Sequence, residues 1–172
     1  MTKLVVRVRG VAYGVFYRLP HRWRRRLVRL GTAKFTVGAV VLMRTVDSDG
    51  PPRIVLLRQP PGRGWSLPAG LLKRGEPTEV GAARELYEET GVRVAPDELI
   101  PGQPSAVVHT DGRWVDVVYE ARVPADVVFA VDGAEVFEAA WHPLDDLPKL
   151  TMATERLLGF YHIGPRATPH DG

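Results

Sequence analysis

Residues 70–92 read GLLKRGEPTEVGAARELYEETGV, a glycine-containing loop that runs into a segment rich in carboxylates. Pro77 is compatible with the first turn of a helix, and Gly91 stands where a left-handed C-terminal cap is expected. The stretch therefore predicts a helix over 78–90, roughly three turns long.

Three glutamates of this helix are spaced so that they share one face. Glu85, Glu88 and Glu89 stand at i, i+3 and i+4, which brings their carboxylates within reach of a common point. Arg84 alone cannot neutralise them, and hard oxygen donors suit Mg²⁺, Mn²⁺ or Ca²⁺ better than zinc. The spacing by itself is consistent both with a divalent-metal site and with a solvated acidic helix face.

The same stretch matches a longer pattern, G-x5-E-x7-R-E-U-x-E-E-x-G-U with U an aliphatic residue, at every specified position. The matching residues are Gly70, Glu76, Arg84, Glu85, Leu86, Glu88, Glu89, Gly91 and Val92. In this respect the chain resembles the Nudix hydrolase family, whose box forms a loop–helix–loop. The resemblance implies the α/β class, with an α/β/α sandwich around a mixed β-sheet.

The resemblance also implies an activity and residue roles. The implied protein is a metal-dependent pyrophosphohydrolase that uses Mg²⁺ or Mn²⁺ to cleave a nucleoside diphosphate linked to another moiety. Arg84 would orient the glutamates by charge-assisted hydrogen bonds, and Glu76 would support the loop through Arg84. The implied metal ligands are Glu85, Glu88, Glu89 and Gly70, and the implied catalytic residues of the box are Glu88, Glu85 and Arg84.

The chemistry of such a substrate requires both neutralisation and a nucleophile. A diphosphate is an anion that repels hydroxide, and bound metal ions can neutralise it while lowering the pKa of an attacking water. A glutamate would accept the proton of that water. A further carboxylate beyond the box, Glu135 or Glu138, is a candidate metal ligand or general base. Glu138 is the preferred one, and an ordinary exposed strand residue is the alternative.

The approach to the box bears on the substrate. Arg58, and the segment from Trp65 to Ala69, resemble ADP-ribose and sugar-nucleotide pyrophosphatases, in which alanine often precedes the glycine. We therefore predict that Arg58, Trp65 and Ala69 bind substrate, although core packing is the more usual role of a tryptophan. The alternatives are a nucleoside triphosphate pyrophosphohydrolase, including one for oxidised purines, and a non-catalytic nucleotide-binding module.

The composition excludes several other classes. With 172 residues, 45% hydrophobic and 25% charged, the chain is typical of one globular domain. It has no cysteine, which excludes a disulfide framework, a thiolate metal site and a thiol nucleophile. Charges interrupt each apolar run before the roughly 18 residues of a spanning helix, so we expect a cytoplasmic protein.

Apolar alternation and turn signals give a coarse order of elements. Segments 35–43 and 53–57 predict a hairpin, and a mixed sheet between helices is expected. Further strands are predicted over 93–100, 106–109, 114–123 and 136–141, and a closing helix over 151–161. The predicted organisation is a basic N-terminal arm (1–34), a Nudix domain (35–163) and a flexible C-terminal tail (164–172).

The arm differs from the rest in charge. Of the 23 lysines and arginines, ten lie in the first 34 residues, where no Asp or Glu occurs. An apolar stripe recurs at helical spacing, and we favour packing of this stripe on the domain or on a second subunit of a homodimer. Contact with anionic lipid or RNA phosphate, and closure over an anionic substrate, are the alternatives. The stripe consists of Phe16, Leu19, Trp23, Leu27 and Leu30.

Overall fold

The computed structural model describes residues 3–32, 34–45, 50–109 and 113–167. The chain divides into two compact units, Met1–Phe35 and Thr36–Gly172. Part of the connection between the two strands of the predicted hairpin lies outside the described residues, as do residues 110–112 and the tail from residue 168. No helix within these ranges is long and apolar enough to cross a membrane.

The first unit contains two helices, α1 (Lys3–Arg18) and α2 (His21–Gly31). The prediction of one continuous stripe is wrong, because the helix is interrupted at Leu19 and Pro20. Proline has no N–H to donate and disfavours a helical conformation in the residue before it. Phe16 therefore belongs to α1, whereas the stripe from Trp23 onward belongs to α2.

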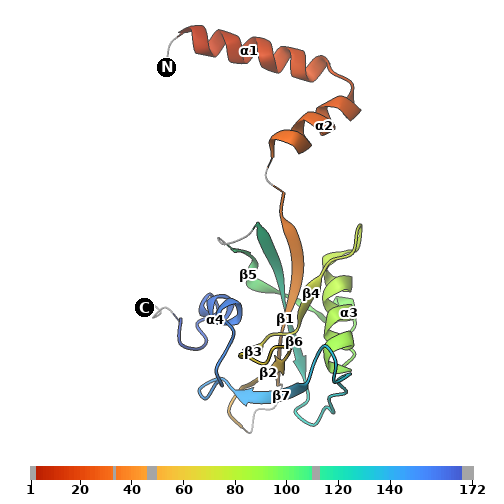
Figure 1. The fold of residues 1–172 in the computed structure, drawn as a ribbon, viewed down its shortest axis with the longest axis vertical. Coiled ribbons are helices and arrows are strands. Elements are labelled where there is room, and N and C mark those ends of the chain that lie inside the picture. The colour runs from red at the N-terminus through yellow and green to blue at the C-terminus, as the bar shows by residue number, and fades with distance from the viewer. Residues whose placement is uncertain (1–2, 33, 46–49, 110–112, 168–172) are drawn as a thin grey trace. The chain divides into compact units, whose positions relative to one another are not determined.

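The second unit is built on a seven-stranded mixed sheet, ordered β3-β2-β1-β6-β5, with β4 paired to β1 and β7 paired to β2 (Figure 1). Strands β1 and β6 run parallel over their whole length, and the other pairings between the described strands are antiparallel. The predicted hairpin is confirmed by the antiparallel pairing of β1 with β2. The strands are β1 (Thr36–Thr45), β2 (Arg53–Arg58), β3 (Trp65–Ser66), β4 (Ala69–Leu71), β5 (Ile100–His109), β6 (Trp114–Val123) and β7 (Glu138–Pro143).

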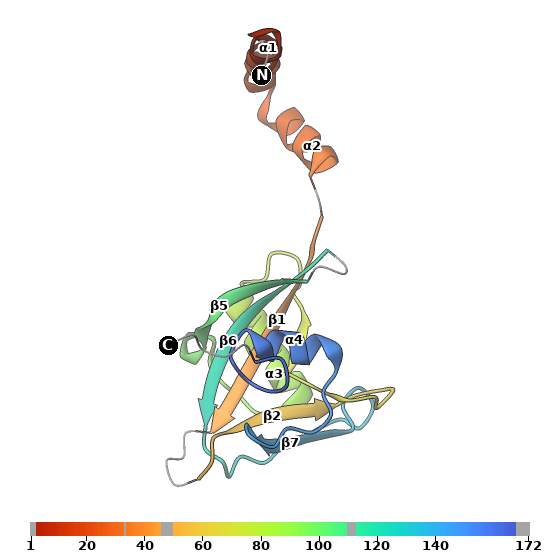
Figure 2. The same ribbon diagram turned by 90° about the vertical axis from the view of Figure 1, so that its left-hand side faces the viewer.

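Two helices cover opposite faces of this sheet, α3 (Thr78–Thr90) and α4 (Met152–Gly159) (Figures 1 and 2). Strand β1 is buried on both sides, because alternate side chains of a strand point to opposite faces. Val41 packs in the core cluster that contains Leu86 of α3, and Leu42 packs in the cluster that contains Leu158 of α4. The structure is thus the predicted α/β sandwich with a mixed sheet.

The predicted helix over 78–90 is confirmed at both ends. Pro77 is its N-cap, and Gly91 ends it in the left-handed conformation at φ 75°, with its N–H donating to the carbonyl of Tyr87 over 2.8 Å. A side chain at Gly91 would also collide with Ala130, since an added Cβ would lie 2.8 Å from the Cβ of that residue. The segment near Ala130 is therefore held against the end of α3.

Two predicted segments differ from the structure. Most of 93–100 is not a strand, because Pro96–Glu98 forms a short 3-10 helix and the Glu98 carboxylate accepts a hydrogen bond from the Ala95 N–H over 3.0 Å. The beginning of the predicted flexible tail contacts α4 instead, through an ion pair of 3.3 Å between Arg166 and Glu155. Both differences arise from side-chain contacts that the apolar pattern does not encode.

The anchoring of α3 on the sheet gives a first prediction. Leu86 is fully buried, so truncation to alanine should leave a cavity and lower the free energy of unfolding by about 2–5 kcal/mol. Val80 lies on the same helix and is 41% exposed, so Val80→Ala is the matched control and should cost much less. Urea unfolding followed by circular dichroism measures both, and equal losses would contradict the packing described.

Candidate active site

One guanidinium group links the loop of the box to its helix. Arg84 donates to both carboxylate oxygens of Glu76, from Nε over 2.9 Å and from Nη2 over 3.0 Å, and Nη2 also donates to the Leu71 carbonyl over 3.1 Å. Its Nη1 donates to Glu85 over 2.6 Å and to Glu88 over 3.0 Å. The hydrogen bond with Arg84 is the main reason that the pKa of Glu76 is lowered to about 2.

A pair of glycines lets the elements around this group converge. A Cβ added to Gly70 would lie 1.9 Å from the carboxylate carbon of Glu85, so the Glu85 carboxylate occupies the space that a side chain would fill. Gly38 on β1 is also constrained, because an added Cβ would lie 3.2 Å from the Gly70 carbonyl and 2.8 Å from an Asp116 oxygen. The Gly70 contact therefore brings β4 close to α3, and the Gly38 contact brings β1 close to β4 and β6.

Glu89 is held differently from the other glutamates of the box. It is only 9% exposed, and its two oxygens accept hydrogen bonds from the Ala69 N–H over 2.8 Å and from Gln59 Nε2 over 2.6 Å. Burial raises the pKa of Glu89 to about 7, and the charges of Glu85 and Glu135 add to this effect against the two hydrogen bonds. A nearby cation would favour the ionised form.

The carboxylates do not form a preassembled ligand cluster. In the ranges that the structure describes, no three Asp, Glu or His side chains are grouped closely enough to hold a metal ion. Glu85 and Glu88 bind Arg84 in this arrangement, whereas Glu89 binds uncharged donors, and a metal site shared by the three glutamates stays a prediction. The oxygen-only donor set, with Gly70 against Glu85, still fits a hard cation such as Mg²⁺ or Mn²⁺.

A cavity of about 150 Å³ is lined by residues of the sheet, of α4 and of the segments next to them, and no glutamate of the box is among them. Gln59 and Ala69, which hold Glu89, also line this cavity, so the predicted substrate-binding residue Ala69 lies at the junction. Arg58 and Trp65 are not among its lining residues. Arg58 forms an ion pair with Glu138, and Trp65 packs edge-on against His142 with ring centroids 4.5 Å apart. The described contacts of Trp65 are those of a packing residue.

The buried carboxylate of Asp116 was missed by sequence reasoning. Asp116 is 9% exposed, lines the cavity, lies 2.7 Å from His109 Nε2 and accepts a hydrogen bond from the Trp114 indole. The sequence contained a signal for this position, because Asp116 stands two residues before the buried Val118 in an apolar strand, so both side chains point to the same face. Such a position places the acid on the face covered by α4.

The further carboxylate predicted beyond the box also differs in placement. Glu138, the preferred candidate, lies opposite Arg58 in the β2–β7 pairing and forms an ion pair of 3.1 Å with it. Glu135 is instead the acid whose charge contributes to the raised pKa of Glu89. The charge of Glu135 therefore acts on Glu89, whereas Glu138 is paired with Arg58.

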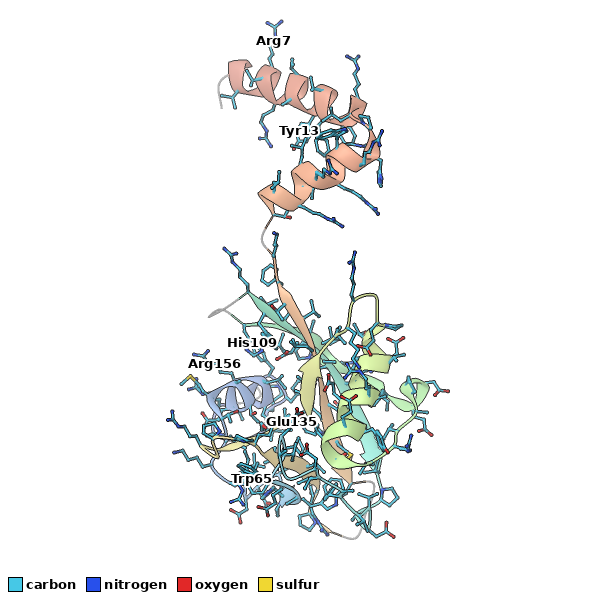
Figure 3. All side chains as sticks on the ribbon, turned by 45° about the vertical axis from the view of Figure 1, so that its right-hand side comes forward. Arg7, Tyr13, Trp65, His109, Glu135 and Arg156 are labelled. Carbon is cyan, nitrogen blue, oxygen red and sulfur yellow. The ribbon has the colours of Figure 1, made fainter. Side chains whose placement is uncertain are left out.

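The loop that carries Glu135 is anchored at the end of α3 (Figure 3). The Ala130 N–H donates to the Thr90 carbonyl over 2.9 Å. An oxygen of Asp132 accepts hydrogen bonds from the N–H groups of Ala134 and Glu135, each over 3.0 Å. These bonds fix the backbone of Glu135 near the last turn of the helix that bears Glu88 and Glu89.

The fold, with the glutamates of the box carried on α3, is that of a hydrolase of the α/β class, of the Nudix type. The family model of the NUDIX domain matches residues 34–162, and the chain belongs to the Nudix family. It is 46% identical over 136 residues to a MutT-like protein from Streptomyces ambofaciens, covering 74% of this chain and 79% of that protein.

Two further similarities extend the comparison. The chain is 37% identical over 101 residues to the NAD-capped RNA hydrolase NudC of Mycobacterium bovis, covering 58% of this chain and only 31% of that protein. The structure superposes on a MutT NUDIX hydrolase from Burkholderia pseudomallei with a TM-score of 0.59 and 30% identity, covering 73% of this chain and 96% of that one.

The contact between Gly70 and Glu85 gives a second prediction. Gly70→Ala should displace the Glu85 carboxylate, which is the mobile end of a side chain, so hydrolysis should fall by roughly 10- to 100-fold while stability changes little. Gly50→Ala is the control, because an added Cβ there meets nothing closer than 3.8 Å. Steady-state kinetics and thermal unfolding should be measured together; full activity in Gly70→Ala would contradict a role for this contact.

Proposed function

We propose that the protein is a metal-dependent pyrophosphohydrolase that cleaves a nucleoside diphosphate linked to another moiety, of the ADP-ribose or sugar-nucleotide type, in the cytoplasm. The observation that carries the proposal is that Arg84 donates hydrogen bonds to both Glu85 and Glu88, while the Glu85 carboxylate lies directly against Gly70. The buried Glu89 is close enough to Glu85 for the charge of Glu85 to raise the pKa of Glu89.

Each residue of the site would have a separate role in the reaction. Glu85, Glu88, Glu89 and the Gly70 carbonyl would hold Mg²⁺ or Mn²⁺, which when bound supplies neutralisation of the diphosphate and activation of a water. Arg84 fixes the orientation of Glu85 and Glu88 through directional hydrogen bonds. A carboxylate within hydrogen-bonding reach of that water would accept its proton.

The cavity lined by Gln59 and Ala69 is the proposed site for the group attached to the diphosphate. These two residues link it to the box, because both also bind Glu89. The Asp116 carboxylate provides an acceptor for hydroxyl or amino donors of such a group. The name of the NudC relative is consistent with this choice, because an NAD cap contains a nucleoside diphosphate linked to a second nucleoside.

The proposal is tested by measuring hydrolysis of a panel of substrates by the wild-type protein and by a variant that lacks one charge of the site. With Mg²⁺, we expect ADP-ribose or a sugar nucleotide to be cleaved far faster than dinucleotides and nucleoside triphosphates. Glu88→Gln should lower this turnover by roughly 100-fold or more, since ligands matter at least as much as the residues that orient them. Glu88 is half-exposed, so the fold should survive.

Asp126→Asn removes an exposed acid outside the site and serves as the control. Phosphate and nucleotide release should be measured for each compound, with thermal unfolding of each variant. Preference for a nucleoside triphosphate would overturn the proposed substrate class. Equal turnover in Glu88→Gln would overturn the assignment of the site.

A matched pair of substitutions tests which acid beyond the box takes part. Glu135→Gln should lower hydrolysis by about 10-fold or more, because it removes the carboxylate that would serve as an additional metal ligand or general base near Glu89. Glu138→Gln breaks only an exposed ion pair with Arg58, so we expect nearly unchanged kinetics. The reverse order in steady-state kinetics would restore Glu138 as the catalytic candidate.

A further inference from the structure

We propose that the N-terminal arm, defined as α1 and α2, binds the surface of an anionic lipid bilayer. The first argument is charge. Ten lysines and arginines and no acids lie in residues 1–34, so this segment presents a single sign of charge. Clustered basic residues on an amphipathic helix are attracted to the acidic headgroups of a membrane leaflet.

Helix α2 separates its charges from its apolar residues. Arg22, Arg25, Arg26 and Arg29 recur at intervals that place them on one side of a helix. The other side carries Trp23, Leu27 and Leu30, which are 50%, 47% and 84% exposed. None of the residues of α2 is buried. A helix with arginines on one face and Trp and Leu on the other fits the plane between headgroups and acyl chains.

Helix α1 presents an aliphatic face of its own. Val8, Val11 and Val15 follow one another at three- and four-residue intervals, and all three are more than half exposed. Arg7 borders this row, since it lines the same surface pocket as Val8 and Val11, and Figure 3 shows Arg7 and Tyr13 leaving the helix on different sides. An aliphatic row next to basic residues repeats the division seen in α2.

The aromatic residues of the arm are placed beside guanidinium groups. The Arg26 guanidinium lies 5.2 Å from the centroid of the Trp23 ring, and that of Arg24 lies 6.0 Å from the Tyr17 ring. Trp and Tyr are enriched where a membrane meets water, and long basic side chains extend their charge toward the headgroups. Such pairs therefore suit the boundary between lipid and water.

Other partners would contact either the basic residues or the apolar residues of the arm, but not both. An RNA backbone would bind the arginines by counterion release but leave the aliphatic rows in water. A second copy of the arm would cover the aliphatic rows but would bring two clusters of nine positive charges together. An anionic bilayer matches both the charge and the apolar faces at once.

The test uses the full-length protein and sedimenting vesicles of phosphatidylcholine, either pure or with roughly one third phosphatidylglycerol. We expect binding to the anionic vesicles and little to the neutral ones. The apolar-face variant W23S/L27S/L30S keeps every charge and should weaken binding by at least about tenfold. The basic-face variant R22Q/R25Q/R26Q/R29Q should weaken it as much. Val128→Ser, at an 85% exposed valine outside the arm, should bind normally.

Three results would overturn the proposal. The first is no preference for anionic vesicles in the wild-type chain. The second is full binding by the apolar-face variant together with tight, arginine-dependent binding to single-stranded RNA, which would indicate a nucleic-acid surface. The third is a dimer in size-exclusion chromatography that the apolar-face variant dissociates.

Circular dichroism melting checks that each variant keeps its folded domain. Brominated lipid should quench the tryptophan fluorescence of the wild-type protein more than that of Trp23→Phe.

Discussion

Repulsion among neighbouring carboxylates is the constraint on which the site depends, and Arg84 is the group that relieves it. Its planar guanidinium has donors on two edges, so it binds Glu76 from the loop and Glu85 and Glu88 from the helix at the same time. A lysine ammonium could not span these partners in fixed directions. Because Arg84 also binds the carbonyl of Leu71 in β4, the helix is held in one rotational setting against the sheet.

Glu89 shows the opposite solution, because its partners are uncharged. A backbone N–H and an amide satisfy its oxygens, but they do not offset the loss of water, and its pKa is raised. The site thus combines Glu76, whose charged form is stabilised by Arg84, with Glu89, which is costly to ionise. Acids with perturbed pKa values are typical of functional sites, and a divalent cation near Glu89 would favour its ionised form.

The parts of the molecule that the sequence predicts are those whose partners are close in sequence. Helix α3 and the contacts of Arg84 follow from local spacing, and the helix was predicted at both of its ends. The cavity could not be predicted, because Asp116 reaches Gly38 only through the parallel pairing of β1 with β6. Glu138 was preferred over Glu135 for the same reason, since the pairing of β2 with β7 that gives it Arg58 as a partner is not visible in the local pattern.

The uneven distribution of charge has a consequence for substrate capture. Every one of the 20 acids lies beyond residue 34, so the unit that contains the site is acidic, whereas the diphosphate of the proposed substrate is itself an anion. The long-range field of this unit therefore opposes the approach of substrate. Attraction must arise locally, from Arg84 and from the cation that the glutamates would hold. In the proposed reaction the cation is then needed for binding the substrate as well as for activating water, because the net negative charge of the unit around the site repels the anionic diphosphate.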